Sequence, residues 1–224
     1  MDPITQGALG ASLPQSFVNK SQVMIAGILG FLSGMAPDLD VFIRSETDPL
    51  LFLEFHRQFT HSLFFIPIGG LICAIFFYFL FCRRTTLTFK QTYLYCTLGY
   101  ATHGLLDTCT SYGTQLLWPF TSQRFSWDTV SIIDPVLTLP LLMLVTLAAI
   151  RKNSKYALAG LIWVISYQCI GLYQNNRASE AGWQLAIERG HAPIRLSAKP
   201  TLGNLILWKV IYEVEEGFYV DAVR

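Results

Sequence analysis

The chain has 224 residues, of which 52% are hydrophobic and only 14% are charged, a balance too apolar for an ordinary soluble domain of this length. Its net charge of +1 excludes the strongly basic surface typical of nucleic-acid-binding proteins. The five cysteines lie in or beside apolar runs without CxxC spacing, which indicates small core residues. We therefore expect an integral membrane protein with no nucleic-acid partner.

Apolar stretches long enough for membrane helices recur along most of the chain, given that a spanning helix needs roughly 20 mostly apolar residues. The first stretch, residues 3–18, is rich in small residues and contains Pro14, so it spans, re-enters or lies on the interface. Clearer candidates follow at residues 22–37, 62–82, 93–109, 132–150 and 156–173. The sequence thus predicts a mainly α fold, a polytopic bundle of five or six membrane helices within residues 1–173.

The C-terminal part of the chain has a different composition. From residue 174 onward it resembles a soluble protein, and residues 205–224 alternate in polarity around Glu215-Glu216-Gly217. This alternation predicts a β-hairpin. We expect residues 174–224 to form a small extracytoplasmic tail.

Short loops enriched in lysine and arginine indicate which side of the membrane is cytoplasmic. If each clear stretch crosses once, one side receives all the basic loops, which contain Lys20, Arg83, Arg84, Lys90, Arg151, Lys152 and Lys155. Residues 38–61, 110–131 and the tail then share the other side. We expect a multi-pass protein of the bacterial inner (cytoplasmic) membrane whose candidate site faces the extracytoplasmic side.

The segment His103-Gly-Leu-Leu-Asp107 places an imidazole and a carboxylate four residues apart, on one face of a helix. Two ligands in this arrangement can share one metal ion. Charged groups inside a membrane helix are costly and usually have a partner or a functional role. A hydrogen bond that only ties two helices together is the alternative interpretation.

Further candidate ligands flank the expected outer loop. Asp38 and Asp40 follow Pro37 at the end of one apolar stretch, and His56, Arg57 and His61 precede the next. Histidine nitrogens and carboxylate oxygens suit a divalent ion, zinc above manganese or iron. Solvated acids at a helix end and histidines among lipid headgroups are the alternatives.

Several motifs together resemble a known family, the bacterial membrane-bound predicted metal-dependent hydrolases of the LexA-regulated type. The likeness covers most of the chain and rests on Asp2-Pro3-Ile4-Thr5, Pro37-Asp38-Leu39-Asp40, His56-Arg57, Thr60-His61-Ser62, His103-Gly-Leu-Leu-Asp107, Thr110-Ser111-Tyr112-Gly113-Thr114 and Ile133-Asp134-Pro135. A more distant likeness is to zinc-dependent phospholipase C, which implies phosphoester substrates. Family members often carry histidine after the opening threonine, where this chain has Gln6, so one ligand is absent or replaced by an amide.

These observations favour hydrolysis of an ester or phosphoester by a metal-activated water. The expected metal ligands are Asp40, His56, His61, His103 and Asp107. Asp38 is the expected second-sphere residue or general base, and Arg57 the expected clamp for an oxyanion or phosphate. A site at the membrane face favours a lipid or other amphiphile as substrate. A small transporter or proton relay that uses the same cluster is the main alternative, and a metal-stabilised scaffold without turnover is another.

Overall fold

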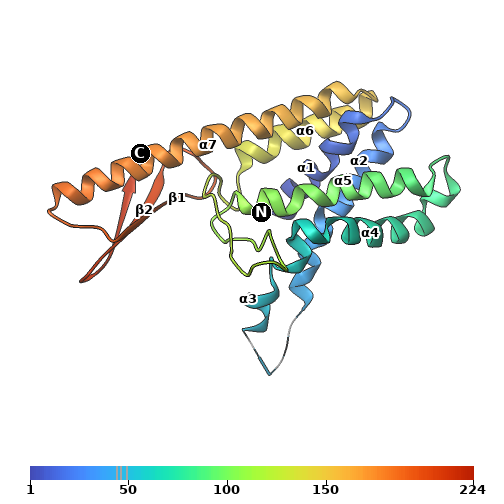
Figure 1. The fold of residues 1–224 in the computed structure, drawn as a ribbon. Coiled ribbons are helices and arrows are strands. Elements are labelled where there is room, and N and C mark those ends of the chain that lie inside the picture. The colour runs from blue at the N-terminus through green and yellow to red at the C-terminus, as the bar shows by residue number, and fades with distance from the viewer. Residues whose placement is uncertain (44, 46, 49) are drawn as a thin grey trace.

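The protein is a bundle of helices with a small antiparallel sheet near its C-terminus (Figure 1). The computed structural model describes residues 1–43, 45, 47–48 and 50–224. The long helices are α1 (Pro3–Phe17), α2 (Val23–Met35), α4 (Ile66–Leu80), α5 (Phe89–Thr108), α6 (Pro135–Arg151) and α7 (Ser154–Glu188). Shorter elements are α3 (Leu51–Phe55) and the 3-10 turns η1 (Ala36–Phe42), η2 (Phe59–His61), η3 (Leu63–Phe65) and η4 (Cys82–Arg84).

Several helical segments have the length and composition of membrane spans. Among the described residues, the segments Val23–Phe42 and Leu63–Leu80 and an apolar stretch within α7 are long and apolar enough to cross a bilayer, and α6 is apolar but shorter. Their surfaces carry large exposed apolar side chains such as Ile72, Phe76 and Met143. In water such a surface would be a liability, whereas lipid covers it without cost. The predicted helical membrane bundle is therefore confirmed.

Helix α1 lies inside the bundle, where it contacts α2, α5, α6 and α7. Its residues 5–12 are all buried. The crossing with α2 is so close that a Cβ on Gly10 would lie 2.5 Å from the main-chain oxygen of Gly30. Small residues permit this kind of approach between membrane helices. The weak apolar character of residues 3–18 follows, because α1 faces protein rather than lipid.

The two ends of the bundle differ in composition. The short connections α1–α2, α4–α5 and α6–α7 lie at one end (Figure 1), and in or beside them are Lys20, Arg83, Arg84, Lys90, Arg151, Lys152 and Lys155. The N-terminus, the segment from η1 to η3 and the connection 109–134 lie at the other. At that end Asp2 caps α1, and Asp134 caps α6 by accepting from two main-chain amides. The Asp-Pro motifs at both positions are thus helix N-termini.

Helix α7 continues through residue 174, where the sequence turns polar, and ends at Glu188. Its polar half supports an antiparallel sheet of β1 (Arg195–Pro200), β2 (Trp208–Val214) and β3 (Gly217–Val223), in the order β1-β2-β3. The predicted hairpin is confirmed as β2 and β3, and β1 adds a strand that the polarity pattern did not reveal. A lone hairpin is marginal in water, and the third strand and the helix provide the packing that it needs.

Candidate metal centre

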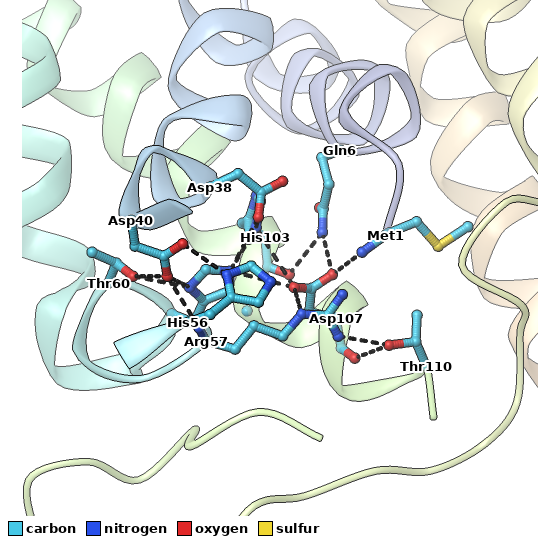
Figure 2. A network of polar contacts seen from close by, with 12 residues as sticks. Met1, Gln6, Asp38, Asp40, His56, Arg57, Thr60, His103, Asp107 and Thr110 are labelled. Atoms are coloured by element: carbon cyan, nitrogen blue, oxygen red, sulfur yellow. Dashed lines mark hydrogen bonds and ion pairs between the residues drawn. The ribbon is translucent and has the colours of Figure 1, made fainter. Parts of the chain in front are cut away.

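Four side chains converge where η1, η2 and α5 meet (Figure 2). Asp38 comes from η1, His61 from the end of η2, and His103 and Asp107 from successive turns of α5. One ligand atom from each residue lies within 4.8 Å of all the others. The side chains of His61, His103 and Asp107 are fully buried, whereas 22% of the Asp38 side chain is exposed.

His61 and His103 direct their Nε2 atoms toward each other. His103 Nδ1 lies 2.6 Å from the Gly34 carbonyl oxygen, an acceptor, so this nitrogen carries the proton in a neutral ring. His61 Nδ1 is likewise held by Thr60 Oγ1 at 3.0 Å and Asp40 Oδ2 at 3.3 Å. Two neutral rings therefore present lone pairs across the 3.0 Å between their Nε2 atoms. This arrangement is repulsive unless a cation or a proton lies between them.

The electrostatics of His61 lead to the same conclusion. Burial lowers the pKa of His61, but Asp107, Asp38 and Asp40 outweigh it and raise the pKa to about 10. Nearby opposite charges favour a protonated imidazole in this way. Arg57 and the Met1 amino group offset two of the three carboxylates, so one negative charge remains for a protonated His61 or another cation to balance.

The distances between the four atoms suit a small metal ion. Asp38 Oδ1 lies 3.5 Å from His61 Nε2 and 3.3 Å from His103 Nε2, and Asp107 Oδ2 lies 3.3 and 3.8 Å from the same atoms. Zinc bonds of about 2.0–2.2 Å in a tetrahedron place neighbouring ligand atoms about 3.3–3.6 Å apart. Asp107 Oδ2 is also buried and accepts no well-directed hydrogen bond among the described residues, although Arg57 Nε lies 2.9 Å from it as an ion-pair partner. The donor set and these distances therefore fit a divalent ion such as zinc.

Glycine at position 104 allows η2 to approach α5. A Cβ there would lie 2.1 Å from the carbonyl oxygen of His61, a distance that real contacts do not show. The main chain of η2 therefore rests directly on α5, one residue beyond His103. This contact sets the spacing of the two histidines.

Asp40 holds the outer side of the cluster. Its carboxylate accepts from His56 Nδ1 at 2.8 Å, from the Arg57 amide at 3.0 Å and from Thr60 Oγ1 at 2.9 Å, and it faces His61 Nδ1. These four donors match the roughly four lone-pair sites of a carboxylate. Asp40 therefore orients its neighbours, as second-sphere carboxylates do in metal sites. Asp38, Asp40 and His56 form a second group whose ligand atoms also lie within 4.8 Å.

Arg57 adopts a left-handed backbone conformation with φ of 61°. Such a conformation costs a non-glycine residue about 1–3 kcal/mol and is concentrated at functional sites. The Asp40 carboxylate and the Gln115 amide hold its main chain in place. Its guanidinium contacts Asp107 Oδ2 through Nε at 2.9 Å and Thr110 Oγ1 through Nη1 at 2.8 Å.

Sequence reasoning missed the role of Arg124 in the long connection 109–134. The Arg124 guanidinium donates to the carbonyl oxygens of Leu53, Glu54, His56 and Gly113 at 3.0–3.2 Å. It therefore fastens the segment that carries His56 to the connection after α5. Main-chain acceptors have no side-chain signature, so no motif could have revealed this contact.

Two groups from the N-terminal segment complete the surroundings of Asp107. The Met1 amino group contacts Oδ1, and Gln6 Nε2 donates to the same oxygen at 2.8 Å. Gln6 Oε1 is buried without a partner among the described residues. Gln6, which stands where the resembled family often carries histidine, thus lies beside the cluster.

A cavity of about 500 Å³ opens beside the cluster. Asp38, His56, Arg57 and Tyr112 form its polar side. The apolar side is formed by Met35, Leu39, Val41 and Ile132, together with Met1 and Pro3. Leu39 and Ile132 are 61% and 47% exposed, so the apolar side reaches the protein surface.

Comparison with known proteins identifies an inner membrane protein family and two bacterial relatives. The family model described as YdjM inner membrane protein matches residues 1–178. The uncharacterised protein YfhP of Bacillus subtilis (strain 168) is 26% identical over 113 residues, which cover 50% of this chain and 32% of YfhP. The inner membrane protein YbcI of Escherichia coli (strain K12) is 30% identical over 107 residues, 46% of this chain and 60% of YbcI. The chain thus matches less than two thirds of either relative, and no solved structure matches it.

Proposed function

The chain belongs to the YdjM inner membrane protein family, and we propose that it is a membrane-embedded, metal-dependent hydrolase. Its substrate is an ester or phosphoester of a lipid or another amphiphile. The observation that carries the proposal is the set of two histidine nitrogens and two carboxylate oxygens that lie within 4.8 Å of one another, with each nitrogen 3.0–3.8 Å from the other nitrogen and from both oxygens. An inner membrane location is supported by the family and by the apolar helices.

We assign His61, His103, Asp38 and Asp107 as the ligands of one ion, with zinc as the preferred metal. When bound, such an ion would lower the pKa of a coordinated water to about 7 and polarise the substrate oxygen. Asp40 is saturated by four donors, so it keeps His61 in the correct tautomer instead of binding a second ion.

The remaining polar groups handle the substrate. His56 lines the cavity while its Nδ1 is held by Asp40, so its imidazole is the group we assign to general acid–base catalysis. Arg57 lines the same cavity and offers a positive charge to the developing oxyanion. Leu39 and Ile132 then contact the apolar part of an amphiphile whose headgroup lies at the cluster.

The arrangement offers little support for a relay across the membrane. Among the described residues, the buried acidic, basic and histidine side chains are Asp40, Arg57, His61, His103, Asp107 and Asp134. All of them belong to the end of the bundle that carries the cluster. The basic loops lie at the opposite end, so the positive-inside rule favours an extracytoplasmic cluster.

The test compares two histidines in the detergent-purified protein. His103→Ala should lose bound metal and the hydrolysis of long-chain p-nitrophenyl esters or phosphodiesters. His191→Ala is the matched control, because His191 pairs with Tyr212 in the C-terminal region. This substitution should leave metal content and hydrolysis unchanged. Arg57→Lys should keep the metal and lower turnover. Full metal occupancy in His103→Ala would overturn the ligand assignment, and metal binding without hydrolysis of any such substrate would favour a scaffold.

A further inference from the structure

The loop between β1 and β2, residues 201–207, carries three large apolar side chains on its surface. Leu202, Ile206 and Leu207 are 73%, 56% and 43% exposed, whereas Leu205 is buried and anchors the loop in the core. The loop contains no charged residue. A cluster of exposed apolar residues outside the helices marks an interaction surface.

Hydrogen bonds place this loop at the level where the membrane helices end. Gly203 donates its amide to Ser131 Oγ, just before the start of α6. Gln174 Nε2 donates to the Leu205 carbonyl oxygen from the point where α7 turns from apolar to polar. The neighbouring Tyr173 is 66% exposed, and tyrosine is enriched at membrane interfaces. The exposed side chains of Ile132 and Ile133, beside the start of α6, continue the apolar surface.

The main chain of the loop satisfies much of its own hydrogen-bonding capacity. Asn204 Oδ1 accepts from the amides of Ile206 and Leu207, and the amide and hydroxyl of Thr201 donate to the Leu207 carbonyl oxygen. Paired backbone groups lower the cost of entering a poorly hydrated region.

Two lysines flank the loop on paired strands. Lys199 and Lys209 are directly opposite each other in the β1–β2 register. Like charges in this position destabilise a sheet in water. Anionic lipid phosphates at the same depth would neutralise them.

From these observations we infer that residues 201–207 insert into the headgroup region of the leaflet on the side of the cluster. Leu202, Ile206 and Leu207 contact acyl chains, and Lys199 and Lys209 contact lipid phosphates. The C-terminal sheet is therefore a membrane-bound element. This inference rests on the membrane location of the helices and is independent of any hydrolase activity.

The test measures the depth of nitroxide labels on the full chain in nanodiscs of phosphatidylethanolamine and phosphatidylglycerol. Cys169 is the exposed cysteine among the five, so Cys169→Ala provides the background. A label on Leu202→Cys should collide more with oxygen, which enters bilayers, than with a water-soluble nickel chelate. Glu216→Cys is the matched control, because it lies at the far end of β2, about 20 Å from the loop, and its label should favour the chelate. A Leu202→Cys label as accessible to the chelate as the control would overturn the inference.

Discussion

Gly104→Ala is a sensitive test of the histidine spacing. The new Cβ would lie 2.1 Å from the His61 carbonyl oxygen, so η2 must move away from α5 by about 1 Å to restore contact at 3.0–3.4 Å. Metal sites tolerate deviations of only about 0.2 Å from standard distances. We therefore expect metal affinity to fall on the order of 10- to 100-fold, the loss typical of damage to groups that position ligands.

The stability of the same variant should change less than its affinity for metal. Overpacking lowers the free energy of unfolding by about 1–3 kcal/mol, whereas alanine stabilises a helix by about 0.5–1 kcal/mol relative to glycine. Gly160→Ala in α7 is the control, since its new Cβ would meet mainly a flexible Leu141 methyl group at 3.2 Å. Metal content by mass spectrometry, chelator competition and thermal unfolding should be compared for the two variants. Wild-type metal affinity in Gly104→Ala would refute the proposed role of the His61–His103 spacing.

Three further predictions concern the surroundings of the cluster. Gln6→His should raise metal affinity, measured by chelator competition, because an imidazole would replace an amide whose oxygen is unpartnered; unchanged affinity would show that residue 6 does not reach the ion. Arg124→Lys should retain metal but speed amide hydrogen exchange at residues 53–57, because one ammonium group cannot bridge four carbonyl oxygens. Unaltered exchange would show that Arg124 does not hold this segment in place. Leu53→Cys in the Cys169→Ala background should react with an impermeant thiol reagent added outside intact inner-membrane spheroplasts, and Thr86→Cys should not; the reverse pattern would invert the topology.

Periodicity and charge were sufficient to predict much of the architecture. The spacing of His103 and Asp107 places both on one helical face whatever the tertiary structure. The loops rich in lysine and arginine indicate which helix ends lie together at one end of the bundle. Residues 3–18 were ambiguous because hydropathy reports contact with lipid, whereas α1 is covered by other helices. The strand β1 was missed because its short, mixed sequence becomes a strand only when it pairs with β2.

The candidate site was predictable as a set of residues but not as a geometry. Sequence spacing cannot show that Asp40 is surrounded by four donors while Asp38 faces the two histidine Nε2 atoms. It also cannot show the Gly34 carbonyl that fixes the tautomer of His103. Both depend on where the ends of separate helices meet, and this is set by tertiary packing.

The unbroken length of α7 has a mechanical consequence. A helix of 35 residues is about 52 Å long, and the hydrocarbon core of a bilayer is about 30 Å thick, so about 20 Å projects beyond it. Because no loop separates the two halves, the projecting half acts as a rigid strut whose tilt follows that of the membrane half. Because a membrane helix adjusts its tilt to the thickness of the bilayer, a change in thickness would tilt the projecting half and so raise or lower the sheet relative to the lipid surface.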